Sequence, residues 1–244
     1  LAITATMTFL ASVFVLLRFL ARRKTSVQLD DWICLASLTV AYGFLVATAL
    51  MVTIGQAGHD QSSYDRHTRQ VSIQSYLATD ILATSCLSLT KLSILLSYRR
   101  IFVVKPAFRR ATWVIGGLVF AYFVSANCVV IFPSKPVEDE SHTRHSYNAV
   151  WVAFCSLNLA LDITVLCLPQ SIVWRLKMTR QRKIQLSLVF LLGAFVCVAS
   201  IVRIYFVSEL DMDNLTYSLL SVANWNAIEM TTGIICSCLP MMPS

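Results

Sequence analysis

Charged residues are scarce in this sequence. They make up only 14% of its 244 residues, whereas soluble domains carry about 25% charged residues. Hydrophobic residues account for 57% of the chain, and its mean hydropathy is +0.67. This balance excludes a soluble enzyme and indicates an integral membrane protein.

Glycine and proline are also few, with 7 and 6 residues. No glycine-rich linker, low-complexity tract, internal repeat or strand-like alternation interrupts the chain. We therefore expect a single all-α domain over residues 1–244, and we expect this sequence to be the core of a longer protein whose tails it lacks.

Long apolar runs dominate what is present. Most are long enough to cross a bilayer as a tilted helix, which predicts a bundle of seven transmembrane helices. The seven expected spans are residues 1–20, 31–54, 72–98, 112–132, 148–174, 184–208 and 215–239.

Catalytic and metal-binding motifs are absent. The sequence has no H-E-x-x-H, G-x-S-x-G or P-loop motif. Its eight cysteines all fall inside the expected spans, which argues against a disulfide framework or a zinc site. His59 and His67 share a polar loop with two aspartates, but their spacing fits no zinc signature. We expect no metal and no cofactor.

The net charge of +7 is unevenly distributed among the loops. The loops after the first, third and fifth spans hold most of the basic residues, and the other three hold acidic residues with few basic ones. The positive-inside rule then places the N-terminus outside and the C-terminus in the cytosol. This explains the positive charge without a nucleic-acid partner. The basic residues expected to face a cytosolic signalling partner are Arg99, Arg100, Arg109, Arg110, Arg180, Arg182 and Lys183.

The third span carries two charges inside its apolar run, Asp80 and Lys91. A charge at the centre of a bilayer costs about 2.5–3.5 kcal/mol. The two residues lie about three helical turns apart, so they share one face of a helix. That face must contact other helices or a water-filled cavity.

Asp162, Arg203 and Glu229 also lie within expected spans. Their depths suggest that Arg203 pairs with Asp80 in the outer third of the membrane. Lys91 lies deeper and is within reach of either Asp162 or Glu229.

Neighbouring polar residues extend this set on the same helix faces. It is either an ion-pair network that fixes helix register, or the wall of a ligand cavity or proton path. The candidate ligand-binding or polar-core residues are Asp80, Lys91, Asn158, Asp162, Arg203, Trp225, Asn226 and Glu229.

Several motifs resemble those of the fungal rhodopsin-domain integral membrane proteins. This seven-helix family includes receptor-like proteins and members encoded in mycotoxin gene clusters. The glycine-histidine stretch at 55–59 (GQAGH) departs from the family pattern. The matching stretches are 29–32 (LDDW), 90–102 (TKLSILLSYRRIF), 158–169 (NLALDITVLCLP), 183–193 (KIQLSLVFLLG), 200–204 (SIVRI), 213–217 (DNLTY) and 225–240 (WNAIEMTTGIICSCLP).

The resemblance implies a receptor-like membrane protein and leaves its ligand open. Retinal proteins attach their chromophore to a lysine in the last helix, but residues 215–239 contain none. We therefore predict no retinal Schiff base, and a visible absorbance band after incubation with retinal would contradict this.

The leading hypothesis is a receptor-like protein of the fungal plasma membrane that senses a small ligand or surface cue. It would signal through its basic cytosolic loops. The main alternative is a membrane-embedded enzyme or accessory protein of a specialised-metabolite pathway. A transporter is disfavoured by the absence of paired repeats, and a purely structural scaffold is the fourth hypothesis.

Overall fold

The computed structural model describes residues 1–22, 28–54, 66–101, 106–131, 142–173, 180–208 and 215–239. These residues form helices throughout and contain no strand, which confirms the expected all-α class. The helices are α1 (Ala2–Arg22), α2 (Leu29–Thr53), α3 (Arg66–Ile101), α4 (Pro106–Ile131), α5 (His142–Val173), α6 (Arg180–Ser208) and α7 (Leu215–Cys238).

Each helix coincides with one of the apolar runs, but α3, α4, α5 and α6 begin several residues before the apolar residues do. The helical hydrogen-bond ladder does not require apolar side chains, so a helix can continue into polar flanking residues. Hydropathy alone therefore marks where the chain prefers lipid, and not where the helix begins.

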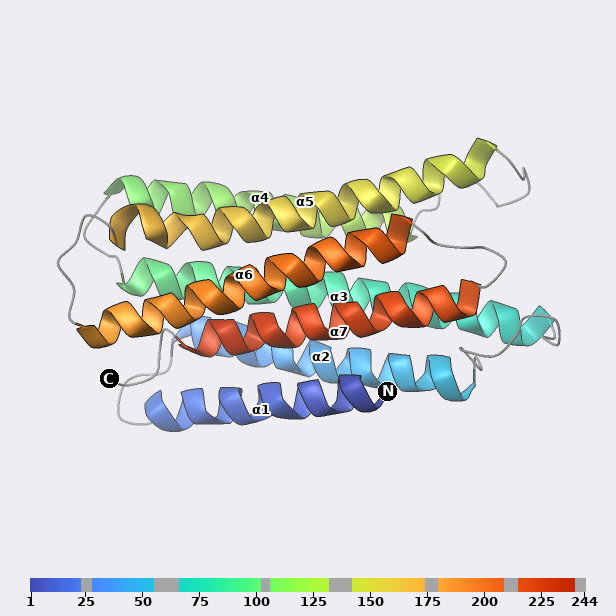
Figure 1. Cartoon of the computed structure of the whole chain (residues 1–244), viewed down its shortest axis with the longest axis horizontal. Coiled ribbons are helices and arrows are strands. Elements are labelled where there is room, and N and C mark those ends of the chain that lie inside the picture. Colours follow the sequence, from blue (N-terminus) through green and yellow to red (C-terminus); the bar gives the residue numbers. More distant parts are fainter. Residues whose placement is uncertain are drawn as a thin grey trace.

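The helices run roughly along one long axis of an elongated bundle (Figure 1). Consecutive helices contact one another, and α7 returns to contact α1. α3 lies in the interior, where it contacts α2, α4, α5 and α7. In the most apolar stretch of α3, 67% of the residues are buried, whereas the corresponding stretches of α4 and α5 are only 17% and 11% buried.

Six of these helices are long and apolar enough to span a membrane, namely α1 to α6. α7 is the exception because it carries Asn224, Asn226, Glu229, Thr231 and Thr232 within its length. It contacts α1, α2, α3 and α6, and every residue from 229 to 238 is buried. A helix packed among other helices does not need a lipid-compatible surface.

The outer surface of the bundle is apolar. Large hydrophobic side chains project from α1, α4 and α6, with Phe9, Trp113 and Leu191 each more than 65% exposed (69%, 66% and 67%). Such a surface would aggregate in water and matches the acyl chains of a bilayer. The protein is thus an integral, multi-pass membrane protein.

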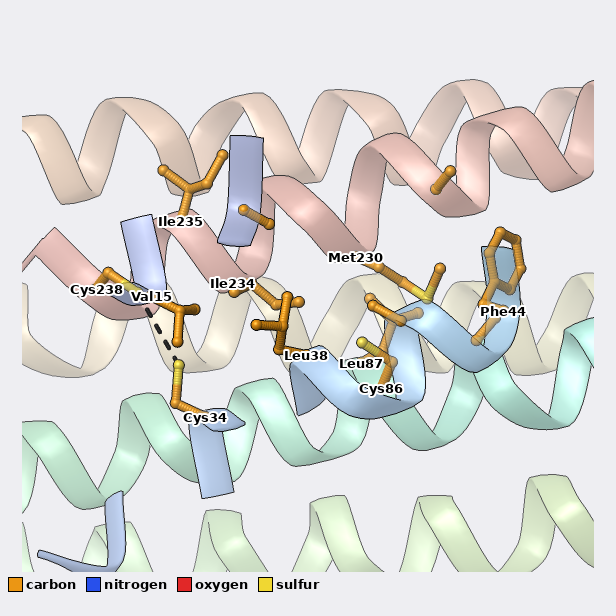
Figure 2. Packing of buried hydrophobic residues seen from close by; sticks show 14 of the residues in the cluster. Val15, Cys34, Leu38, Phe44, Cys86, Leu87, Met230, Ile234, Ile235 and Cys238 are labelled. Carbon is orange, nitrogen blue, oxygen red and sulfur yellow. Dashed lines mark hydrogen bonds between the residues drawn. The ribbon is translucent and has the colours of Figure 1, made fainter. Parts of the chain in front are cut away.

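Two clusters of buried apolar residues hold the helices together. The first joins α1, α2, α3 and α7, with Leu38 and Met230 among its members (Figure 2). The second joins α3 to α4, α5, α6 and α7 around Tyr98 and Val119. α3 and α7 contribute to both clusters, so the central pair links the two halves of the bundle.

Candidate functional site: a buried charge network beside a pocket

Lys91 of α3 reaches across to α5. Its Nζ atom lies 3.2 Å from Asp162 Oδ1 and donates a hydrogen bond of 2.5 Å to Asn158 Oδ1. The Lys91 side chain is only 4% exposed. Of the two partners expected for Lys91, the structure has Asp162.

Glu229 of α7 is the centre of the network and is fully buried. Its Oε1 atom accepts hydrogen bonds from Asn158 Nδ2 at 2.7 Å and from Ser200 Oγ at 2.9 Å. Its Oε2 atom lies 3.1 Å from Arg203 Nη1. That same Nη1 donates to Asn226 Oδ1 at 2.7 Å.

The expected pairing of Arg203 with Asp80 is therefore wrong. Depth in the membrane ranks residues along the helix axis but does not say which face of the helix they occupy. Arg203 is directed at α7, where Glu229 and Asn226 lie one turn apart.

Asn158 connects the two ion pairs, because it accepts from Lys91 and donates to both Glu229 and Asp162. The result is one continuous network over α3, α5, α6 and α7. Breaking a buried ion pair by removing one partner costs about 3–5 kcal/mol, because the other charge stays buried. The network therefore fixes how these four helices face one another.

Asp80 lies outside this network. With Arg203 it lines a small pocket between α3, α4, α5 and α6, whose cavity volume is about 40 Å³. The pocket also has aromatic walls, formed by Tyr122, Trp151 and Phe154.

The pocket lies towards the end of the bundle where α4 and α6 finish and α5 begins (right in Figure 1). The charge pattern of the loops predicts that this end faces outwards. A ligand arriving from that side would meet the pocket first and the charge network beyond it, with Arg203 common to both.

Trp225 makes no polar contact among the described residues and instead stacks on Phe206 with ring centroids 6.4 Å apart. Its role is thus apolar packing between α6 and α7. Ser200 was not expected in the network, although it lies one turn from Arg203 on α6, and that spacing is a usable signal.

The basic residues at the opposite end are only partly described. Arg109 and Arg110 are exposed in the first turn of α4. Arg99 lies over the ring of Trp113, 5.2 Å from its centroid, which is a cation–π contact. The side chains of Arg180, Arg182 and Lys183 lie outside the described residues.

A second charge cluster, missed in the sequence, joins α1 to α2. Arg18 bonds to Asp30 and Asp31 at 2.8 Å each, and Arg22 pairs with the same two carboxylates. Ser97 of α3 donates to Asp30 at 3.2 Å. All four charged side chains are at most 5% exposed. The sequence contains a pattern that predicts this cluster, because Arg18 and Arg22 are four residues apart and share one helix face.

The eight cysteines are free thiols. Cys34 of α2 and Cys238 of α7 lie with their sulfur atoms 4.0 Å apart in the first apolar cluster (Figure 2). Among the residues that the structure describes, no group of three His, Cys, Asp or Glu side chains could hold a metal ion.

A bundle of membrane-spanning helices with a polar interior and a pocket towards one end defines a polytopic membrane protein of the seven-helix class. The sequence profile of the fungal rhodopsin domain matches residues 17–244. The chain belongs to the fungal rhodopsin domain family, as its motifs indicated.

Curated relatives differ in what their names describe. A SAT4 family membrane protein of Emericella nidulans is 30% identical over 80% of this chain and 52% of its own length. Receptor GIN3 of Arthrobotrys oligospora is 27% identical over 96% of this chain and 58% of its length. Fugralins biosynthesis cluster protein 2 of Gibberella zeae is 24% identical over 84% of this chain and 55% of its own length.

The chain thus spans somewhat more than half the length of the curated relatives it matches. No solved structure matches it.

Proposed function

We propose that this protein is a receptor-like protein of the fungal plasma membrane. A small ligand binds in the pocket that Asp80 lines, and the basic end of the bundle passes the signal to a cytosolic protein.

The contact between pocket and network carries this proposal. Arg203 lines the pocket and is also the ion-pair partner of Glu229. A ligand that displaces the Arg203 side chain changes the interaction of α6 with α7. Because Asn158 links Glu229 to Lys91, the same displacement also changes the contacts of α3 and α5. Ligand binding can bias two arrangements of a bundle only through such differential contacts.

The similarity to a protein named as a receptor supports this proposal. On the opposite end of the bundle, Arg109 and Arg110 are exposed in the first turn of α4. Exposed guanidinium groups attract acidic protein surfaces and increase the rate of association.

The experiment replaces Arg109 and Arg110 together by alanine in the parent fungus. We expect a loss of the protein's transcriptional or cyclic-nucleotide response at unchanged surface abundance. The matched control replaces both by lysine, which keeps the charge and should retain the response. A full response in the alanine variant would overturn the proposed role of this end.

A second function is an enzyme or accessory protein of a specialised-metabolite pathway. It is favoured by relatives named after the biosynthesis clusters of fugralins and satratoxin. The residues for acid–base chemistry would be Asp162 and Glu229, each of which is held by a cation.

Metabolite profiles of strains with Asp162→Ala and Glu229→Ala, compared at equal surface abundance, distinguish the two functions. Accumulation of one discrete intermediate would favour the enzyme. An unchanged pathway with an altered cellular response would favour the receptor.

A further inference from the structure

We propose that the pocket binds a small organic cation, a protonated amine with an aromatic or apolar body. This inference rests on the proposed ligand-binding function and adds the chemical class of the ligand.

The first support is the charge balance of the buried groups. Three carboxylates and two cations lie in the described parts of α3, α5, α6 and α7 around the pocket. Lys91 is paired with Asp162, and Arg203 is paired with Glu229. Asp80 has no hydrogen bond or ion pair with any residue that the structure describes. The excess negative charge therefore lies on the pocket wall, where a ligand can reach it.

The second support is the group of aromatic side chains that line the pocket together with this carboxylate. Tyr122 and Phe154 are adjacent, with centroids 6.2 Å apart, and Trp151 lies beside them in the lining. The electron-rich faces of aromatic rings attract ammonium groups, and they also accommodate an apolar ligand body. A pocket lined by one carboxylate and three aromatic rings is thus complementary to an amphipathic amine.

An anionic ligand is the competing chemistry, because Arg203 also lines the pocket. However, its charge is already offset by Glu229 at 3.1 Å. Its Nε atom lacks a hydrogen-bond partner among the described residues but is buried, so a ligand in the pocket does not reach it without rearrangement. Asp80 is only partly buried and is the more accessible charge.

The experiment measures binding to the full chain in lipid nanodiscs by calorimetry. Its three probes share one aromatic ring and differ in charge: phenethylamine, phenethyl alcohol and phenylacetate. We expect the amine to bind at least about tenfold more tightly than the other two, and Asp80→Asn to remove this preference.

Two further variants keep the test valid if Asp80→Asn folds poorly. Phe154→Leu opens the aromatic wall and should weaken amine binding, whereas Phe120→Leu, at a side chain 59% exposed on α4, should not. Equal or tighter binding of the acid or the alcohol would overturn the inference. So would an unchanged amine preference in Asp80→Asn, or binding of none of the probes.

Failure of this inference is distinguishable from failure of the proposed function. Binding of phenylacetate that depends on Phe154 would reject the amine and keep a ligand-binding receptor. An unaltered cellular response after replacement of Arg109 and Arg110 would reject the proposed signalling surface whatever the probes show.

Discussion

The guanidinium of Arg18 donates a hydrogen bond of 2.5 Å to the backbone carbonyl oxygen of Ser237, and so joins the first helix to the last. α7 ends at Cys238, and the last carbonyl groups of a helix have no partner within it. A cation at this place also interacts favourably with the helix dipole. One buried side chain thus satisfies two aspartates of α2 and the end of α7.

Arg18→Met should destabilise the bundle strongly. It leaves Asp30 and Asp31 buried with Arg22 as the remaining cation, and a broken buried ion pair costs about 3–5 kcal/mol. We expect a lower midpoint of thermal unfolding, followed by tryptophan fluorescence in detergent. Arg110→Met, which removes an exposed guanidinium, is the control and should leave the midpoint nearly unchanged. Equal midpoints for both variants would refute the structural role of Arg18.

Lys91 and Asp162 should be energetically coupled. A double-mutant cycle with Lys91→Met and Asp162→Asn should give a coupling free energy of about 0.5–3 kcal/mol, because the two groups share a buried ion pair. Denaturant unfolding of the four proteins measures it. The cycle of Lys91→Met with Arg110→Met should instead be additive within about 0.5 kcal/mol. Additivity in the first cycle would contradict the pairing.

Glu229→Gln separates a receptor from a scaffold. Glutamine keeps an oxygen that can accept from Asn158 and Ser200 but loses the charge opposite Arg203. Thermal stability should fall whether the protein is a receptor or a scaffold, because Arg203 remains buried without a counter-charge. A receptor should also change its cellular response at equal surface abundance. A response identical to that of the parent protein would support the scaffold.

Gly193 and Gly117 provide a matched pair of alanine substitutions. A methyl group at Gly193 would overlap Leu166 Cδ1 of α5, whereas a methyl group at Gly117 meets no atom within 4 Å. Gly193→Ala should therefore force the Leu166 side chain to move and should be the less favourable of the two substitutions. Gly117→Ala should be neutral or stabilising by up to about 1 kcal/mol, because alanine favours the helix. The order of the two melting midpoints tests the close packing of α5 against α6.

The number and class of the helices could be predicted, because twenty-residue apolar runs have few other physical meanings. The need to bury the charged face of α3 could also be predicted, and 67% burial of its apolar stretch agrees with it. Helix ends could not, since polar residues at the membrane surface continue a helix as readily as they end it.

Partners across helices were harder to predict than the helices themselves. Lys91 had two possible acids, and nothing in the sequence decides between them, because the choice depends on how α5 and α7 are rotated. Depth in the membrane matches Arg203 to Asp80, although α6 directs Arg203 to Glu229. The pocket required the three-dimensional arrangement, since its aromatic residues come from α4 and α5 and its charges from α3 and α6.

The cluster of Arg18 with Asp30 and Asp31 has a consequence for biogenesis. α1 emerges from the ribosome before α2, and its Arg18 carries a charge that is unfavourable in lipid. The carboxylates that neutralise it follow only 12 and 13 residues later. We expect the translocon to release α1 and α2 into the membrane together as a neutral hairpin, and not one after the other.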